Sequence, residues 1–292
     1  MASQDTTTSR YPLIKQIAAT RRKPDMTHKE FLDYHYQVHG SIADAPEDPN
    51  LKPYKYIQSH VFDSAFGARK PPTGGKAPPN ANHPWVGRDD ATELWFKDLD
   101  HMLHNFGSEH VRTTVGPDAL HFADLGASIN LMAFEKPLPL TTDLGEGAVK
   151  VDEAAGRHAT TALYFVALPG GERDGAQAEK IITPLLREAL EAETRQEVWK
   201  WVVNVGLTIP EFDPSSYFGG ADLPKYALVY KIYLKDPTAI GAFRKAQKVF
   251  EKQEKIDVGN SFVLFTKEVL VASVADGFSF DKTHQPVFND IS

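Results

Sequence analysis

The stretch RRKPDMTHKEFLDYHYQVHG, Arg21–Gly40, predicts a helix with a well-marked start and a row of aromatic and imidazole side chains. Thr27 and Glu30 have the spacing of a capping box, so the helix should begin directly after Thr27. Gly40 is expected to end it, because glycine readily adopts the backbone conformation that follows a helix. The apolar and aromatic face at helical spacing consists of Phe31, Tyr34 and Val38.

The histidines of this helix, His35 and His39, lie one turn apart and leave two interpretations open. A histidine at a helix C-terminus can bind the last carbonyl groups and interact favourably with the helix dipole. Alternatively, His39 lies at the mouth of a pocket, where an imidazole can move protons near neutral pH. A metal site on the pair is disfavoured, because the sequence offers neither an H-E-x-x-H pattern nor a third ligand at short spacing.

The composition excludes several classes of protein. The chain has 292 residues, 41% of them apolar, which is enough for a substantial core. The net charge of −7 and the lack of a basic, aromatic-rich stretch disfavour a nucleic-acid partner. Cysteine is absent, so disulfides and thiolate catalysis are excluded. Without an apolar run for a signal peptide or a membrane span, we expect a cytoplasmic monomer or homodimer with a small-molecule partner.

Hydrophobic patterns divide the chain into two halves with the same order of elements, βαββαβ. In the first half the predicted strands are 11–19, 54–62, 92–96 and 127–135, and the predicted helices are 27–40 and 99–106. In the second half the predicted strands are 160–168, 197–205, 225–234 and 261–272, and the predicted helices are 176–191 and 238–253. Residues 64–90 are rich in Pro and Gly and form either a lid over a pocket or a disordered excursion.

This order predicts an α+β fold built from two ferredoxin-like βαββαβ repeats. The repeats should span 11–136 and 157–274, with a polar linker at 137–156. Each repeat would form a four-stranded antiparallel sheet with both helices on one face, which leaves the other face to be covered. We therefore expect the two sheets to pack face to face and enclose a barrel-like hollow.

The strand at 54–62 is expected to turn a polar and aromatic row toward this hollow. The alternating row with Ile57 and Val61 suits contact with helices better, so the other row should face inward. Such a row makes a poor dry core but a good pocket wall. The inward row consists of Tyr54, Tyr56, Gln58 and His60.

On the next strand of the sheet, Glu93 and Trp95 share a face. If Glu93 also points inward it lies near His60, where a carboxylate would raise the pKa of the imidazole and fix its tautomer. The predicted catalytic residues are His39, His60 and Glu93. The predicted substrate-binding residues are Tyr54, Tyr56, Gln58, Trp95 and His35.

Three segments of the first half resemble the EthD family, within the dimeric α+β barrel superfamily. The segments are RRKPDMTHKEFLDYHYQVHG (Arg21–Gly40), YIQSHVF (Tyr56–Phe62) and ATELWFKDLDHML (Ala91–Leu103). The family shows an R-K-P-x-M-T turn, a helix that reads E-F-x-x-Y and ends in H-G, a Y-x-Q-x-H strand and an E-L-W-F strand. His39 and His60 match the two histidines of this pattern, whereas the family often has Trp at the position of His35. The second half matches only in the order of its elements.

The resemblance implies an intramolecular dimeric α+β barrel, whose second half is a diverged copy of the first. Members of the family are implied to be small cofactor-free enzymes of polyketide tailoring. Our leading hypothesis is a lyase, a decarboxylase or dehydratase, that acts on an aromatic or polyketide-like molecule by histidine general acid/base catalysis. A second hypothesis is a haem-dependent dehydratase or peroxidase with His158 or His284 as axial ligand. A third is a non-catalytic barrel that binds a small molecule.

Overall fold

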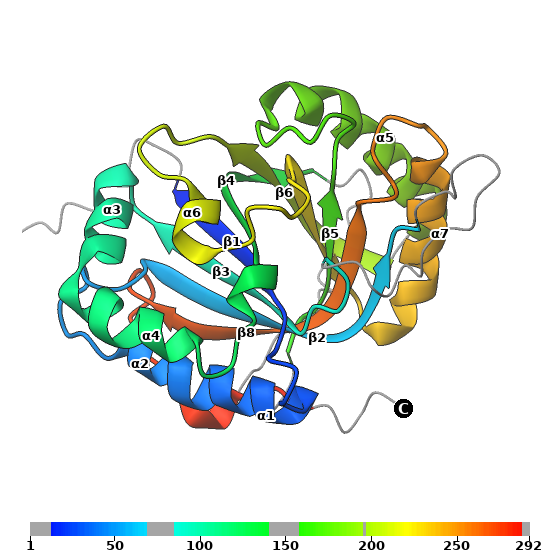
Figure 1. The fold of residues 1–292 in the computed structure, drawn as a ribbon. Coiled ribbons are helices and arrows are strands. Elements are labelled where there is room, and N and C mark those ends of the chain that lie inside the picture. The colour runs from blue at the N-terminus through cyan, green and yellow to red at the C-terminus, as the bar shows by residue number, and fades with distance from the viewer. Residues whose placement is uncertain (1–12, 69–84, 140–157, 195–196, 288–292) are drawn as a thin grey trace, which may run out of the picture.

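The computed structural model describes residues 13–68, 85–139, 158–194 and 197–287. Its centre is a closed barrel of antiparallel strands in the order β1-β3-β2-β8-β5-β7-β6-β4. The predicted mixture of helices and strands and the predicted barrel are confirmed (Figure 1). The strands are β1 (Ile14–Thr20), β2 (Lys55–Phe66), β3 (Asp90–Phe96), β4 (Ile129–Leu138), β5 (Thr160–Val166), β6 (Val198–Leu207), β7 (Leu228–Leu234) and β8 (Phe262–Ser273).

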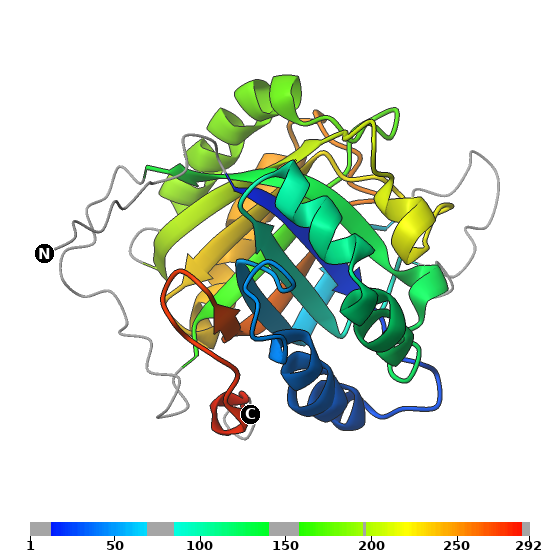
Figure 2. The ribbon, with the colours of Figure 1, turned by 90° about the vertical axis from the view of Figure 1, so that its left-hand side faces the viewer.

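Helices cover the outside of the barrel. Helices α5 and α7 lie against the C-terminal half, and the other helices surround the N-terminal strands (Figures 1 and 2). The helices are α1 (His28–Asp33), the π-helix η1 (Tyr34–Gly40), α2 (Ser41–Asp44), α3 (Leu99–Gly107), the π-helix η3 (Val111–Val115), α4 (Gly116–Ala119), α5 (Ala176–Thr194), α6 (Pro214–Phe218) and α7 (Ile240–Glu251). Short turns of 3-10 helix occur at η4 (Leu125–Ala127), η7 (Pro237–Ala239) and η8 (Lys282–His284).

Within the barrel, the N-terminal strands follow the order β4-β1-β3-β2 and the C-terminal strands the order β8-β5-β7-β6. The two sets join where β2 pairs with β8 and where β4 pairs with β6. Most of the predicted linker, residues 140–156, lies outside the described residues. Its first residues, Pro137 and Leu138, belong to β4 and pair with β6.

The interior of the barrel is filled by side chains from both halves. Apolar residues such as Ile17, Leu163 and Leu264 form one cluster there. Strand alternation places Ile57 and Val61 on this inner face, which corrects the expectation that they face the helices. The predicted hollow lined by imidazoles is therefore wrong as an account of the barrel interior.

A network of buried charges completes this interior. The ammonium of Lys15 lies 2.6 Å from a carboxylate oxygen of Glu93 and 2.6 Å from one of Glu135. Lys231, on β7, forms ion pairs with Glu93 and Glu268. Buried charges are tolerated when each has a partner of opposite sign, and here the partners come from both halves of the chain.

Candidate functional site

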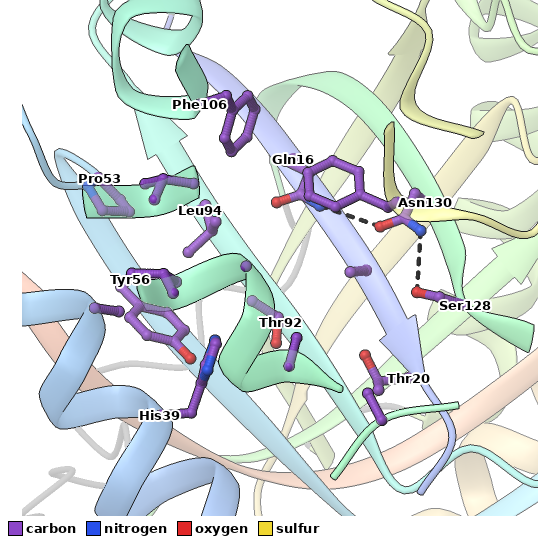
Figure 3. A pocket seen from close by; sticks show the side chains of 18 of the residues that line it. Gln16, Thr20, His39, Pro53, Tyr56, Thr92, Leu94, Phe106, Ser128 and Asn130 are labelled. Carbon is purple, nitrogen blue, oxygen red and sulfur yellow. Dashed lines mark hydrogen bonds between the residues drawn. The ribbon is translucent and has the colours of Figure 1, made fainter. Parts of the chain in front are cut away.

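A cavity of about 210 Å³ lies outside the barrel, between the N-terminal strands and the helices that cover them. Its floor is the outer face of β1, β3 and β2, represented by Gln16, Thr92 and Tyr56 (Figure 3). Its walls are largely apolar and include Phe106 and Phe122. A concave, mostly apolar pocket with a few polar groups is the usual form of a small-molecule site.

The register between β2 and β3 decides which predicted residues face this pocket. Tyr56 pairs with Leu94 and Gln58 with Thr92, and these outward positions alternate with Ile57 and Glu93 on the inner face. Glu93 and His60 therefore lie on opposite faces of the sheet. The expectation that Glu93 lies beside His60 is wrong.

The helix of the opening stretch carries two histidines into the pocket. The capping box of Thr27 and Glu30 is present, as predicted. The helix does not end at Gly40, however, but continues through η1 into α2. In a π-helix, hydrogen bonds span five residues, so positions four apart lie nearly above each other. The rings of His35 and His39 are accordingly 5.5 Å apart, and both line the pocket.

Gly40 is needed for packing rather than as a helix end. A Cβ atom at this position would lie 3.3 Å from a methyl group of Val271 on β8. Such a contact is tight, so glycine lets η1 approach the barrel closely.

His39 is held by a carboxylate from a distant part of the chain. Its Nδ1 lies 2.8 Å from Oδ2 of Asp118, on α4, and the hydroxyl of Tyr34 donates to the other carboxylate oxygen at 2.8 Å. Burial tends to raise the pKa of Asp118, but the hydrogen bonds from His39 and Tyr34 lower it overall. Burial and the adjacent carboxylate raise the pKa of Tyr34 to about 12. An ionised Asp118 thus accepts the Nδ1 proton, which leaves Nε2 of His39 as the basic nitrogen.

A second group of polar side chains supports Tyr56 from below the pocket. The amide of Gln58 donates to the hydroxyl oxygen of Tyr56 at 2.7 Å and to the carbonyl of His35 at 2.9 Å. Its amide oxygen lies 2.9 Å from Nε2 of His60. The hydroxyl oxygen of Tyr56 lies 3.4 Å from Nε2 of His35, which makes this hydrogen bond long and weak. The Tyr56 proton is therefore free to turn toward a ligand.

Burial keeps this second group neutral. It lowers the pKa of His60 to about 3 and the pKa of His35 well below its usual value. Burial also raises the pKa of Tyr56 and the pKa of Asp90 well above their usual values. A carboxyl oxygen of Asp90 lies 3.4 Å from Nδ1 of His35. These residues can hold and orient hydrogen bonds at neutral pH, but they are unsuited to take up a proton.

The opposite end of the pocket is lined by amides. The side-chain amide of Gln16 donates to Asn130 at 3.1 Å, and Asn130 donates to the hydroxyl of Ser128 at 3.0 Å. Figure 3 shows this chain of hydrogen bonds on β1 and β4, across the pocket from His39 and Tyr56. Among the described residues that line the cavity, none is a lysine or arginine.

Sequence patterns missed the elements that close the pocket. Asp118 follows Pro117 at the start of α4, where a proline in the first turn is the only local signal. Tyr217 and Phe218 come from α6 in the C-terminal half, and the Tyr217 hydroxyl donates to the carbonyl of Phe106 at 2.9 Å. The C-terminal half thus contributes to the wall of a pocket whose histidines and side-chain amides come from the N-terminal half.

The predicted site residues fall into four places. His35, His39 and Tyr56 line the pocket, while Gln58 and His60 lie behind Tyr56. Glu93 and Trp95 lie in the barrel interior, where the ammonium of Lys15 is 4.1 Å from the Trp95 ring. Tyr54 precedes β2 and is not among the residues that line the pocket. Most of the predicted lid, residues 69–84, lies outside the described part of the chain.

The residues proposed as haem ligands lie outside the pocket. Nδ1 of His158 is 3.1 Å from the carbonyl of Glu268, and the ring of His284 stacks on Phe278 at 5.5 Å. Neither residue lines the pocket. Among the described residues, no cluster of three or more potential ligands could hold a metal ion. No helix in the described ranges is both long and apolar enough to cross a membrane.

Comparison with known proteins agrees with this architecture. The model of the EthD domain matches residues 23–126, which confirms the resemblance of the N-terminal half to that family. No curated protein matched the chain. Among solved structures, an anthrone oxidase-like protein is similar with a TM-score of 0.50 and 10% identity, over 90% of this chain and 94% of that one. A mutant chlorite dismutase from Candidatus Nitrospira defluvii gives a TM-score of 0.43 and 10% identity, over 88% and 91%.

At these identities the likeness concerns the fold alone. The fold is a closed barrel of antiparallel strands with helices on its outside, and the likeness to the anthrone oxidase-like protein extends over 90% of this chain. His39 and Asp118 both belong to residues 23–126, the segment that matches the EthD domain.

Proposed function

We propose that this chain is a dehydratase that acts on a small, uncharged, aromatic or polyketide-like hydroxy ketone, using only its own side chains. The observation that carries the proposal is the pair formed by His39 and Asp118, with Nδ1 of the imidazole 2.8 Å from the carboxylate. No hydrogen bond to Nε2 of His39 occurs among the described residues, and His39 lines the pocket. An imidazole held in this way is a general base aimed at a bound molecule.

The reaction begins when Nε2 of His39 removes a proton from the carbon next to the substrate carbonyl. The electron pair of the broken C–H bond moves toward the carbonyl oxygen and gives an enolate. The enolate then forms a C=C bond as the C–O bond to the neighbouring hydroxyl breaks. The proton on Nε2 passes to the departing hydroxide, which leaves as water, so one base serves both halves of the elimination.

The developing enolate oxygen needs hydrogen-bond donors. Tyr56 and Thr92 present hydroxyl groups on the pocket floor beside His39 (Figure 3). The Thr92 hydroxyl already donates to Asp90 at 3.1 Å, which leaves Tyr56 as the donor. Because burial raises the pKa of Tyr56 well above its usual value, its hydroxyl stays protonated and can donate. Preorganised donors of this kind stabilise a developing oxyanion more strongly than a bound neutral carbonyl.

Dehydration fits the pocket better than decarboxylation. A decarboxylase of this kind would bind a carboxylate, whereas no lysine or arginine occurs among the described residues that line the cavity. The carboxylate of Asp118 next to His39 would also repel a second negative charge. A neutral hydroxy ketone meets neither obstacle.

For the chain as a whole we propose two ferredoxin-like repeats, residues 11–136 and 157–274. The equal strand orders β4-β1-β3-β2 and β8-β5-β7-β6 support this division, since each is the order of a single βαββαβ unit. In this proposal the second repeat completes the barrel and contributes α6 to the pocket wall. The protein is a cytoplasmic monomer or homodimer.

The test uses the β-hydroxy derivative of α-tetralone, a bicyclic ketone that gives α-naphthol on loss of water. The purified protein should accelerate the appearance of α-naphthol, and His39→Gln should reduce the rate by about 100-fold or more. His104→Gln changes an exposed histidine on α3 and should leave the rate unchanged. If the wild-type protein binds α-tetralone but gives no turnover, the chain is a binding protein rather than a dehydratase.

A further inference from the structure

Two buried amides that line the pocket each have one polar atom without a hydrogen-bond partner among the described residues. Oε1 of Gln16 and Nδ2 of Asn105 are both fully enclosed and have no partner among the described residues. Each residue is 2% exposed, and each lines the pocket. A buried polar atom without a partner is costly, so a native structure that contains two in one pocket calls for an explanation.

The position of the Gln16 amide is fixed by its neighbours. Its nitrogen donates to Asn130, which in turn donates to Ser128, so the oxygen is directed away from that chain (Figure 3). Reversing both amides would satisfy the same contacts but would still leave one polar atom of Gln16 without a partner. A polar group on the ligand is therefore needed in either orientation. In the orientation shown the unpaired atom of Gln16 is an oxygen, which calls for a donor.

The walls around these amides are aromatic. Phe106 and Phe218 meet edge to face with their ring centroids 5.4 Å apart, and both line the pocket. Such walls suit a flat ring, since aromatic pairs prefer offset or edge-to-face contacts. An anion is disfavoured there, because the described lining residues include no lysine or arginine.

We propose that Gln16 and Asn105 form a subsite for a phenolic hydroxyl at the end of the substrate remote from His39. The hydroxyl donates to Oε1 of Gln16, and its oxygen, or that of an adjacent hydroxyl, accepts from Nδ2 of Asn105. A ketone or a methyl ether cannot donate and would leave Gln16 without a partner. The direction of the substrate in the pocket rests on the proposed function, whereas the hydroxyl subsite itself does not.

The subsite makes the enzyme selective for hydroxylated aromatic substrates. A site built to bind a hydroxyl binds the analogue that lacks it less tightly, because the buried polar groups of the site then stay unpaired. The reacting carbon and carbonyl lie beside His39 and Tyr56, the ring lies between Leu94 and Phe106, and the phenol reaches Gln16. The substrate class is thus a hydroxy ketone fused to a phenolic ring.

The test compares the binding of β-naphthol and its methyl ether, measured by calorimetry without turnover. The wild-type protein should bind the naphthol about 10- to 100-fold more tightly than the ether. Gln16→Met and Asn105→Leu should each reduce that ratio toward unity while the affinity for the ether changes little. The matched control is Gln247→Met, which removes a buried amide on α7, outside the pocket, and should keep the full ratio.

The outcomes separate this inference from the proposed function. His39→Gln should abolish turnover and keep the preference for the naphthol, because the subsite does not involve the base. Equal affinities for the two probes overturn the subsite, as does a preference that survives in both Gln16→Met and Asn105→Leu. Undetectable binding of β-naphthol to the folded wild-type protein overturns it as well. A preserved preference without any turnover would contradict the dehydratase alone.

Discussion

Nδ1 of His39 and the carboxylate of Asp118 lie 2.8 Å apart, although 79 positions separate them in the chain. The contact joins the π-helix η1 to the helix α4, the two elements that close one side of the pocket. Asp118 fixes the imidazole tautomer and stabilises the imidazolium that forms once a proton has been taken up. The same carboxylate accepts the hydroxyl of Tyr34, so its own position is fixed too.

The first prediction concerns this pair. In deuterium oxide, the protein should exchange the protons next to the carbonyl of α-tetralone, which tests proton removal without a leaving group. His39→Gln should slow the exchange by about 100-fold or more, since the general base is lost. Asp118→Asn should slow it by about 10-fold or more, because a neutral amide no longer favours the imidazolium. Proton NMR of the ketone measures the rates.

Lys29→Met provides the control for this experiment, because Lys29 lies on α1 and pairs with Asp33 in solvent, away from the pocket. Its exchange rate should equal that of the wild type. If Asp118→Asn exchanges as fast as the wild type while folded, the carboxylate plays no part in proton transfer.

The second prediction concerns Tyr56. Tyr56→Phe removes the hydroxyl donor for the enolate oxygen and should lower kcat by about 100-fold, the usual effect of losing one donor to an oxyanion. KM should change much less, because the ground-state carbonyl needs the donor less than the enolate does. Tyr54→Phe removes a hydroxyl that does not line the pocket and should leave both constants unchanged. Equal effects of the two variants would refute the role of Tyr56.

The third prediction concerns stability in acid. The pKa of His60 falls from 6.5 in the unfolded chain to about 3 in the folded protein, because burial disfavours the charged ring. Below pH 6.5 the unfolded chain therefore binds more protons than the folded one. The titration of His60 therefore does not reduce the free energy of unfolding above pH 6.5, but it reduces it progressively as the pH falls from 6.5 toward about 3.

This loss amounts to about 1.4 kcal/mol per pH unit for one such histidine. Urea unfolding at a series of pH values should show a shallower slope for His60→Gln than for the wild type. The same change at His158, whose pKa falls only to about 4, should flatten the slope over a narrower range. Parallel profiles for the wild type and His60→Gln would show that His60 is not held neutral.

Sequence patterns located most elements but could not orient the sheet. The capping box of Thr27 and Glu30 and the alternation along the strands are local signals, and they predicted the helix start and all of the strands. Alternation separates the two faces of a strand without saying which face is inside. The inner face of β2 was misassigned because the apolar row with Ile57 and Val61 suits contact with helices equally well. Glu93 does point inward, but its partner there, Lys231, is 138 positions away and leaves no local signal.

The candidate site could be predicted only in part for the same reason. His35, His39 and Tyr56 stand in recognisable local motifs, and all of them line the pocket. Asp118 does not, because its relation to His39 arises only when α4 packs beside η1. The π-helix η1 also has no clear sequence signature, so Gly40 was read as a helix end rather than as a point of close packing.

The fourth prediction follows from the corrected position of Glu93. Glu93→Gln leaves Lys15 and Lys231 with one carboxylate fewer in the barrel interior and should reduce the free energy of unfolding by about 3–5 kcal/mol. The exchange rate per folded molecule should stay close to that of the wild type, because Glu93 lies on the face opposite the pocket. Glu188→Gln, at an exposed position on α5, should change stability by less than about 0.5 kcal/mol.

Denaturant titration and the exchange assay together decide this case. If Glu93→Gln abolishes exchange in a protein that remains folded, Glu93 acts in catalysis after all. Loss of stability alone supports a structural role for the buried charge network.

The most direct measurement for the whole account is a crystal structure of the protein with bound α-tetralone. We predict density for the ketone in the pocket between the N-terminal strands and η1, with its oxygen at hydrogen-bond distance from the hydroxyl of Tyr56. The adjacent carbon should lie about 3–3.5 Å from Nε2 of His39, the separation expected before proton transfer. A ketone bound in the barrel interior, or at any place out of contact with His39, would contradict the account.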